Sequence, residues 1–292
     1  MVFYVVRYSE IGLKGKNRPG FERKLASNIR ISLKNKGLDA ETKALRGRIL
    51  LNVQKKASLR TVFGISSYSQ AEETGALLSE LKQKALKIAG QSKKTTTFRI
   101  STQRINKDYP LASPEINNQV GQHLVDKTGM SVDLEEPDLD ICIEILGGKA
   151  WFFTSKTQGP GGLPVGTQGK ALLLLNSEAA VLAGLLVMKR GCSLDIAITD
   201  ALAQKKYLAL LQSYHPAGIK TYELKNLSDL NKNELNKVLE QAQAKALVVP
   251  DTLDEIQDYP VGVGARVLRP LIALTDKQIG RELEKYKRSA SF

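Results

Sequence analysis

The strongest constraint on the fold is the apolar segment ALLLLNSEAAVLAGLLVMKRGC, which spans residues 171–192. It predicts a buried strand over 171–175, a short turn, and a helix over 178–190 that ends at Gly191. Apolar strands and helices continue to alternate beyond it. We expect strands at 194–198 and 245–249 and helices at about 201–213, 229–243 and 276–287. This alternation is typical of a parallel sheet in a doubly wound, Rossmann-like α/β domain.

The turn within that segment lacks the chemistry of a phosphate site. In ATP-binding α/β domains, phosphates lie at such a strand-to-helix turn, where backbone N–H groups and the helix dipole attract them. Here the turn reads Asn176-Ser177-Glu178 and holds no glycine. The Glu178 carboxylate takes the electrostatic role of a phosphate, and Asn176 and Ser177 are typical helix N-caps. The segment therefore predicts that this domain has the α/β fold of an ATP-binding domain but no longer has the nucleotide site.

The chain before this domain is built from shorter elements. Up to about residue 71, the patterns indicate strands at 2–8, 48–53 and 65–71, a helix around 21–33 and a short helix at 59–63. This order favours a ferredoxin-like α+β domain.

A second group of elements follows, which we expect to form an α/β domain of its own. Its helices are expected at 78–90 and 113–128, and its strands at 95–101, 140–145 and 149–154. Gly147-Gly148 is a hairpin signal between the last two strands. The Gly- and Pro-rich stretch 155–169 is expected to be a linker. We thus expect three domains, over 1–70, 71–165 and 166–292.

Positive charge is concentrated near the N-terminus. The chain carries a formal net charge of +13. Residues 1–60 hold 15 Lys and Arg against 4 Asp and Glu, whereas the remainder holds 28 against 26. A field of this sign attracts the phosphates of nucleic acids and releases counterions on binding. The charge therefore favours nucleic-acid binding, with a solubilising surface as the alternative.

Composition excludes several other classes. Two Cys and two His among 292 residues leave no disulfide framework and no metal-ligand spacing. Cys142 and Cys192 are expected to be small apolar residues rather than reactive thiols, and His123 and His215 to be structural. No apolar run is long enough for a membrane span, and the first residues lack a signal peptide. We therefore expect a cytoplasmic protein without a membrane partner.

Four stretches carry a resemblance to a known family. They are RYSEIGLKGKNRPGFE at 7–22, FRISTQRINKDYPLASPEINNQVG at 98–121, GPGGLPVGTQGK at 159–170 and MKRGC at 188–192. In this order they resemble the tRNA 4-thiouridine synthetase (tRNA uracil 4-sulfurtransferase) family. The resemblance implies an N-terminal ferredoxin-like domain, a THUMP domain that binds the acceptor end of tRNA, and a PP-loop ATP pyrophosphatase domain.

Two of these stretches supply donors suited to phosphates, ribose hydroxyls and base edges. The first is a glycine-punctuated loop, where a backbone can come close to phosphates. In the second, Arg99 is expected in a strand and residues 103–107 in the loop after it, and Tyr109 suits base stacking and packing equally. The candidate RNA-binding residues are Lys14, Lys16, Arg18, Arg99, Gln103, Arg104, Lys107 and Lys156. Each of them alone is also consistent with an ordinary solvated charge.

The third part of the family pattern is not met. The family's PP-loop reads Ser-Gly-Gly-x-Asp-Ser, and counting back from Met188 aligns it with the start of the predicted helix. The aligned positions are Leu175, Asn176, Ser177, Glu178, Ala179 and Ala180, and none matches the motif. A second family stretch corresponds to 248–262, where Asp251 and further acidic residues would resist a triphosphate without Mg²⁺. The family also relays sulfur through a cysteine of this domain, and none follows Cys192.

Two functions from different classes follow. The first is a tRNA-binding protein whose C-terminal domain has lost ATP binding and sulfur transfer, with no catalytic residue, metal or cofactor. The alternative is an active or partner-assisted tRNA uracil 4-sulfurtransferase, which would need ATP, Mg²⁺ and an external sulfur donor or partner enzyme. A different tRNA modification has less support, because neither a Gly-rich methyl-donor loop nor zinc-ligand spacing is present. The expected partner is tRNA, and the resemblance makes a homodimer plausible.

Overall fold

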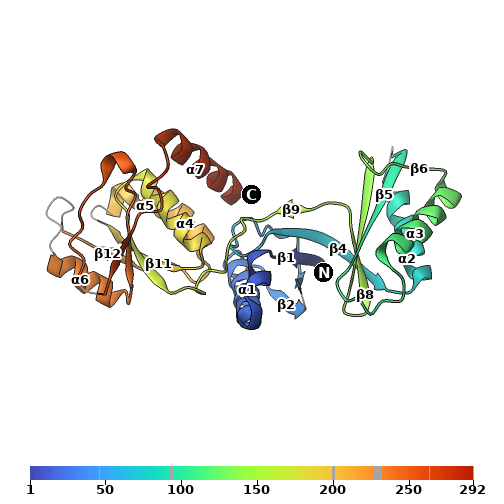
Figure 1. The fold of residues 1–292 in the computed structure, drawn as a ribbon, viewed down its shortest axis with the longest axis horizontal. Helices are drawn as coiled ribbons and strands as arrows, with labels where there is room; N and C mark the ends of the chain where they lie inside the picture. The colour runs from blue at the N-terminus through green and yellow to red at the C-terminus, as the bar shows by residue number, and fades with distance from the viewer. Residues whose placement is uncertain (46, 93–94, 199–200, 226–231, 263, 292) are drawn as a thin grey trace. The chain divides into compact units, whose positions relative to one another are not determined.

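The computed structural model describes residues 1–292 except 46, 93–94, 199–200, 226–231, 263 and 292. The chain divides into two compact units. The first comprises residues 1–7, 40–56 and 67–158, and the second comprises 8–39, 57–66 and 159–292. Figure 1 draws both, coloured from the N-terminus in blue to the C-terminus in red. Each unit therefore combines segments that are far apart in the sequence.

The first unit is built around one sheet. Its described residues form nine strands, in the order β2-β3-β1-β4-β8-β7-β5-β6 with β9 paired to β4. The strands are β1 (Val2–Arg7), β2 (Ala40–Leu45), β3 (Arg48–Val53), β4 (Ser67–Gly75), β5 (Thr97–Arg104), β6 (Ser131–Val132), β7 (Leu139–Leu146), β8 (Lys149–Phe153) and β9 (Thr157–Gln158). Residues 67–71 of β4 pair with β1 and residues 72–75 pair with β8. This strand thus joins a ferredoxin-like half of the sheet to a second half that continues to β6.

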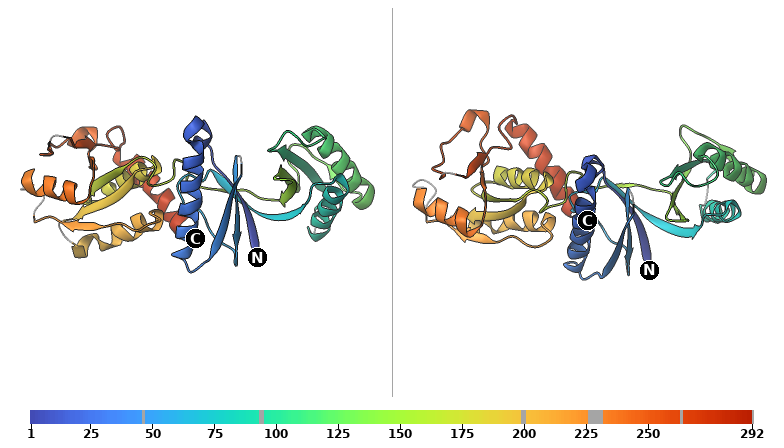
Figure 2. Two further views of the ribbon diagram at one scale, coloured as in Figure 1. Left: turned by 90° about the horizontal axis from the view of Figure 1, so that it is seen from below. Right: turned by 60° about the horizontal axis from the view of Figure 1, so that its bottom comes forward.

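Two helices cover one face of the second half. The views of Figures 1 and 2 show α2 (Leu78–Gln91) and α3 (Ser113–Thr128) side by side on the sheet. Their apolar residues recur every three to four positions, as a helix with one buried face requires. The buried positions are Leu81, Ala85, Ile88, Ile116, Val120 and Leu124. Gly147 (φ +61°) and Gly148 (φ +77°) form the expected β7–β8 hairpin turn.

The second unit carries a parallel sheet with helices on both faces. Its described strands lie in the order β12-β11-β10-β13-β14. The strands are β10 (Lys170–Leu174), β11 (Ser193–Ile198), β12 (Thr221–Glu223), β13 (Ala246–Val248) and β14 (Arg266–Leu268). The helices are α4 (Glu178–Lys189), α5 (Ala201–Tyr214), α6 (Lys232–Gln241) and α7 (Asp276–Ala290). Ala171 and Leu173 pack with α4, α5 and α7, whereas Leu172 and Leu174 pack with α6. The doubly wound fold is thereby confirmed.

The N-terminal helix belongs to the second unit. The segment before and within it comprises η1 (Glu10–Leu13), η2 (Gly15–Asn17) and α1 (Arg18–Lys34). Asn28 Nδ2 donates to the Val165 carbonyl at 3.0 Å, and Asn35 Nδ2 donates to the Pro216 carbonyl at 2.9 Å. These side-chain bonds fasten α1 to the α/β part of the unit.

The expected short helix at 59–63 is wrong. These residues form turns, and the side chains of Leu59 and Phe63 are buried. The Phe63 ring lies 5.1 Å from the Tyr214 ring, centre to centre. Gly64 takes φ +101°, which ends any helical run. Packing of the apolar side chains decides the conformation here, over local helix propensity.

The expected linker at 155–169 contains the point where the chain passes from the first unit to the second, between Gln158 and Gly159, but its later part is packed. The backbone N–H groups of residues 166–168 all donate to the Gly191 carbonyl, at 2.8–3.1 Å. Gly162 has φ +75°, and a Cβ at this position would lie 2.2 Å from the Lys189 carbonyl oxygen. The glycines therefore let this segment approach the end of α4 closely, and they hold it in place rather than make it flexible.

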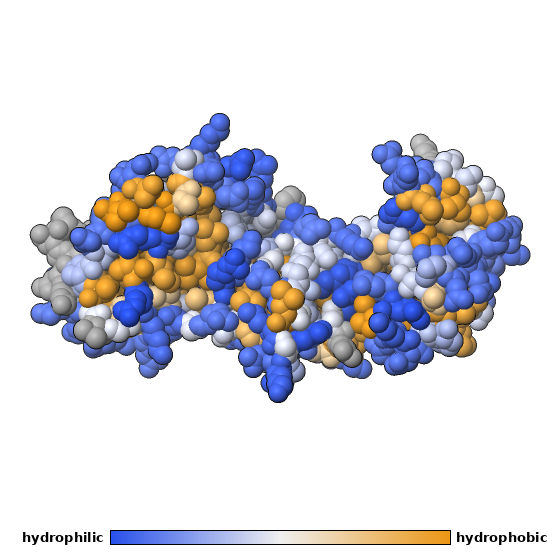
Figure 3. Space-filling view, in the orientation of Figure 1, coloured by the Kyte–Doolittle hydropathy of each residue, from blue (hydrophilic) through white to orange (hydrophobic). Residues whose placement is uncertain are grey.

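The surface mixes polar and apolar residues. In Figure 3, hydrophilic residues in blue cover much of the visible face, with apolar residues in orange between them. No helix in the described part of the chain is long and apolar enough to cross a membrane.

Candidate nucleic-acid interface and phosphate turn

The glycine-punctuated loop of the second unit presents two of the expected cations. Lys16 in η2 is exposed, and half-buried Lys14 has its Nζ 5.2 Å from the centre of the Phe21 ring. Neither lysine forms an ion pair with a carboxylate of the described residues. Both are therefore available to a phosphate.

Arg18, by contrast, is bound within the protein. Its Nε donates to Glu22 Oε1 at 2.8 Å, and its Nη2 donates to the Tyr8 hydroxyl at 2.9 Å. The bond to the carboxylate raises the pKa of Arg18, and burial raises the pKa of Tyr8. Arg18 therefore fixes the start of α1.

Strand β5 ends at Arg104, so Gln103 and Arg104 lie in the strand and not in the expected loop. The strand is longer because it pairs with β7 as far as Ile145. Arg104 Nη1 donates to the Tyr109 carbonyl at 3.0 Å. Gln103 Oε1 accepts from Arg48 Nη2 at 3.0 Å. Both residues thus have partners inside the protein.

Arg99 lies in β5 as expected, but its guanidinium is also bound. Nη2 donates to Asp140 Oδ2 at 2.6 Å, and Nη1 donates to the Leu134 carbonyl at 2.7 Å. The bond to the carboxylate raises the pKa of Arg99. The hydroxyl of half-buried Tyr109 donates to the Ala76 carbonyl at 2.6 Å. Arg99 therefore fastens a loop, and Tyr109 is packed.

Among the candidate RNA-binding residues in the first unit, Lys107 and Lys156 are the exposed lysines. Lys156 Nζ lies 5.8 Å from the centre of the Phe153 ring. Lys107 lines a hollow of about 560 Å³ together with Asn106 and Asp108. Within the described residues, neither lysine forms an ion pair with a carboxylate. Both can therefore meet phosphates without losing an internal ion pair.

A buried charge cluster, which the sequence patterns above do not single out, positions the Arg48 side chain that donates to Gln103. Glu144 in β7 is 2% exposed and accepts from Arg7 Nε at 2.7 Å and from Arg48 Nε at 2.6 Å. Arg7 Nη1 also donates to Ser69 Oγ at 3.1 Å. The signal in the sequence is Glu144, a second carboxylate toward the end of the mostly apolar strand LDICIEIL, because a buried charge requires partners.

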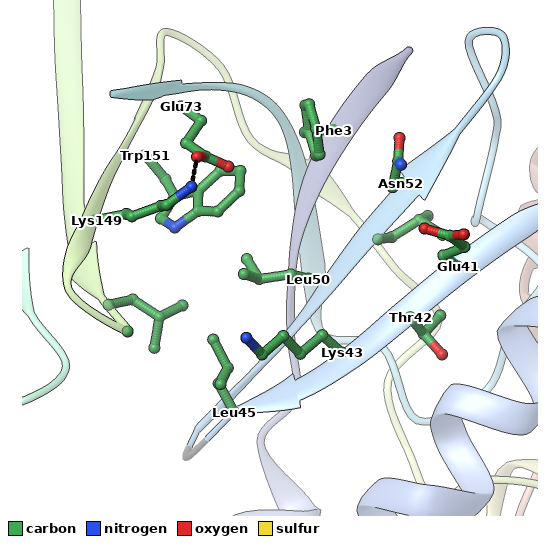
Figure 4. Close-up of a pocket in the computed structure, with 13 residues that line it drawn as sticks. Phe3, Glu41, Thr42, Lys43, Leu45, Leu50, Asn52, Glu73, Lys149 and Trp151 are labelled. Carbon is green, nitrogen blue, oxygen red and sulfur yellow. Dashed lines mark hydrogen bonds and ion pairs between the residues drawn. The ribbon is translucent and has the colours of Figure 1, made fainter. Parts of the chain in front are cut away.

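The first unit also contains a groove of about 490 Å³, shown in Figure 4. Its walls come from β1 to β4 and from the β7–β8 hairpin. The apolar lining residues are Phe3, Leu45, Leu50, Leu51, Leu146 and Trp151, and the polar ones are Glu41, Thr42, Lys43, Asn52, Glu73 and Lys149. Lys149 forms an ion pair with Glu73. Sequence reasoning missed this groove because its residues are brought together from distant segments by strand pairing.

In the second unit, the turn between β10 and α4 has the expected conformation. The strand ends at Leu174 and the helix begins at Glu178, with Ser177 as its N-cap. Ser177 Oγ accepts from the Ala180 N–H at 3.3 Å, and Leu175 and Ala180 are buried in the core. The side-chain cap uses an N–H group of the first helical turn, the kind of donor that a phosphate would need.

Glu178 occupies the start of α4 with its own counter-ion. Its carboxylate is 53% exposed and pairs with Lys287 Nζ of α7 at 2.7 Å, a contact that raises the pKa of Lys287. Asn176 and Ala179 complete the six positions, and none of them is glycine. A phosphate turn needs N–H groups that a ligand can approach closely. The residues present therefore do not fit the phosphates of ATP.

At the end of the neighbouring strand β13, the acidic side chain is also bound by partners within the protein. Asp251, after β13, is 5% exposed and accepts from Arg269 Nε at 2.9 Å and from the Tyr259 hydroxyl at 2.8 Å. Its charge is therefore balanced by the protein without Mg²⁺. Strand order reverses between β10 and β13, and an open α/β sheet binds its ligands at such a reversal. On both sides of this reversal point, polar side chains are thus bound by partners within the protein.

Burial shifts the pKa values of the two cysteines and of His215 toward their neutral forms. Burial raises the pKa of the Cys142 thiol to about 11, and it also raises the pKa of half-buried Cys192. A reactive cysteine needs the opposite shift, toward the thiolate. Burial lowers the pKa of His215 to about 4, and its Nε2 lies 3.1 Å from Ser193 Oγ. Their burial agrees with the structural role expected for them.

Two family models match the first half of the chain. A ThiI ferredoxin-like domain matches residues 3–69, and a THUMP domain matches residues 76–155. The chain is 32% identical to a probable tRNA sulfurtransferase of Thermococcus kodakarensis, over 94% of this chain and 85% of that protein. It is 30% identical to a probable tRNA sulfurtransferase of Bacillus subtilis, over 98% of this chain and 82% of that protein.

Two solved structures share the fold over nearly the whole chain. The crystal structure of PH1313 from Pyrococcus horikoshii matches with a TM-score of 0.83 and 30% identity, covering 98% of this chain and all of that one. The crystal structure of a 4-thiouridine synthetase–RNA complex with bound ATP matches with a TM-score of 0.77 and 25% identity. That match covers 100% of this chain and 87% of the other.

Proposed function

The chain belongs to the tRNA sulfurtransferase family, and we propose that it binds the acceptor end of tRNA through residues 1–165 without ATP-dependent sulfur transfer of its own. The observation that carries the second half of this proposal is the turn between β10 and α4. There, Ser177 caps the helix and Glu178 is paired with Lys287. Packing and ligand binding use different residues, so a family member can keep the fold of a domain while its site changes.

Support for the tRNA-binding half comes from the THUMP match and from the related synthetase solved with RNA. Within the described residues, Lys14, Lys16, Lys107 and Lys156 form no ion pair with a carboxylate, and we assign the phosphate contacts to these four lysines. Arg18 and Arg99 instead hold the fold. Three domains, over 1–70, 71–165 and 166–292, are part of the proposal, and the matches at 3–69 and 76–155 support the first two.

The alternative function is an active or partner-assisted tRNA uracil 4-sulfurtransferase. It is favoured by the likeness of the whole chain to a 4-thiouridine synthetase solved with bound ATP. In that case ATP and Mg²⁺ would bind away from residues 175–180. Sulfur would come from a separate donor, because burial disfavours the thiolate of Cys142 and of Cys192.

Nucleoside analysis separates the two functions. The chain is expressed in a strain that lacks 4-thiouridine synthesis, and bulk tRNA is digested and analysed. The proposal predicts that 4-thiouridine stays absent while the purified chain binds tRNA. The appearance of 4-thiouridine would establish the active enzyme.

The RNA-binding half has its own test. The affinity for a tRNA transcript should fall steeply with salt, because each neutralised phosphate releases condensed counterions. An affinity that does not change between about 50 and 200 mM salt would contradict a phosphate-based interface.

A further inference from the structure

We infer that the groove in Figure 4 takes one unpaired nucleotide of the bound RNA, with its base on the apolar lining. This inference rests on the proposed tRNA binding. The groove volume of about 490 Å³ lies within the range of small-molecule sites. All of its lining residues belong to the first unit, so the site is complete within one compact body.

The lining is suited to a flat aromatic group. Phe3 and Trp151 lie 5.7 Å apart between ring centres, at an interplanar angle of 60°. Phe3, Leu45 and Leu50 are half-buried, so part of their apolar surface faces solvent. Stacking on an aromatic side chain is the usual way in which proteins hold unpaired bases, because every base has a π-face.

The charges around the groove favour a base over a phosphate. Lys43 and Lys149 are balanced by Glu41 and Glu73, and Lys149 is paired with Glu73. A rim that is neutral overall offers no net attraction to a phosphate, whereas an apolar lining favours the base.

A second hollow adjoins the groove. It has a volume of about 560 Å³ and shares Leu45, Leu146 and Gly147 with the groove. Asn106, Lys107 and Asp108 also line it, so its charges are balanced like those of the groove. The geometry assigns the base to the groove and leaves room for the ribose in this second hollow.

Two buried polar atoms in the lining can serve the edge of the base. Asn52 Oδ1 and Trp151 Nε1 are buried and make no hydrogen bond to any described residue. Trp151 is 3% exposed. An acceptor and a donor without partners are costly in a packed protein, so a small side-chain shift that pairs either one with a base edge would be favourable.

The chain contains a single tryptophan, and Trp151 therefore reports on the groove alone. The full chain is titrated with a tRNA transcript and with a fully paired RNA duplex of similar length, and tryptophan emission and affinity are followed together. We expect the tRNA to change the emission and the duplex to bind without changing it. The same emission change with both RNAs, or with neither while tRNA binds, would overturn the inference.

Two substitutions extend this test. Phe3→Ala should weaken tRNA binding by about 5- to 150-fold, the range that corresponds to one lost base stack. Leu45→Ser should also weaken tRNA binding, because it removes apolar surface from the lining, and both variants should leave duplex binding unchanged. Leu77→Ser, at a 69% exposed leucine outside the groove, is the matched control and should change neither. If the unmodified chain binds no RNA, the proposed function is overturned. Normal tRNA binding by both groove variants would overturn the inference about the groove alone.

Discussion

The two sheets of this protein differ in what their polar side chains contact. At the reversal point of the parallel sheet, Ser177, Glu178 and Asp251 all have partners within the protein. In the first unit, Lys107 and Lys156 form no ion pair with described carboxylates, and an apolar groove is open to solvent. A fold shows where a ligand can sit, whereas the partners of the side chains decide whether one fits.

The largest expected effect concerns the buried charges of the first sheet. Glu144→Leu would leave the buried guanidinium group of Arg7 and the part-buried one of Arg48 without their carboxylate. The free energy of unfolding should fall by about 3–5 kcal/mol. Glu73→Gln, at an ion pair whose Lys149 side chain is 55% exposed, should cost at most about 1 kcal/mol. Urea unfolding followed by circular dichroism compares them, and equal losses would contradict the structural role of the cluster.

The second prediction concerns pH and the parallel sheet. Burial lowers the pKa of His215 from 6.5 to about 4. The charge of Asp195 favours its protonation, and the charges of Lys24 and Lys170 oppose it. The unfolded chain then binds a proton that the folded chain does not. The stability from neutral His215 is therefore present above about pH 6.5 and is lost as pH falls toward 4, by on the order of 2–3 kcal/mol.

His215→Gln removes this titration. The difference in unfolding free energy between the unmodified chain and this variant should narrow between pH 6.5 and 4. Parallel pH profiles for the two proteins would show that His215 is not buried as a neutral group.

The third prediction tests the segment that packs on α4. Gly162→Ala would place a Cβ 2.2 Å from the Lys189 carbonyl oxygen at φ +75°, so we expect a loss of about 1–3 kcal/mol. Gly90→Ala in α2 is the control, because nothing lies within 4 Å of its Cβ. That change should stabilise by about 0.4–1 kcal/mol. Thermal unfolding should show that Gly162→Ala lowers the stability and Gly90→Ala raises it. If Gly162→Ala leaves the stability unchanged, close packing of this segment on α4 does not require glycine at position 162.

The smallest effects are expected at the exposed cations. Lys16→Gln and Lys107→Gln should each weaken tRNA binding and reduce the slope of log affinity against log salt by about 1. Lys237→Gln, at an exposed residue of α6 outside the proposed interface, is the control. A slope that is the same in all three variants would mean that the phosphate contacts lie elsewhere.

Much of the fold follows from periodic patterns. The alternation from residue 171 onward predicted the parallel sheet, because buried strands and amphipathic helices are local signals. β2 was not predicted, since Glu41, Lys43 and Ala44 are exposed on an edge strand and show no apolar pattern. The segment at 59–63 and the later part of 155–169 were misjudged because their conformations depend on distant partners, Tyr214 and Gly191.

In the candidate site, too, local sequence patterns were informative and distant partners could not be predicted. Residue type and spacing indicated the cations but not their partners, so Arg18 and Arg99 looked no different from Lys16 and Lys107. Their carboxylates come from another helical turn or from another strand. The groove could not be predicted at all, because sheet pairing alone brings Phe3 and Trp151 together.

The most direct test of the central claim is calorimetric titration of the full chain with ATP and Mg²⁺, once alone and once with a tRNA transcript present. We expect no heat of ATP binding in either titration, together with tight binding of the tRNA itself. Stoichiometric ATP binding in either titration would contradict the claim, and would show that residues 175–180 or another part of the second unit still form a nucleotide site.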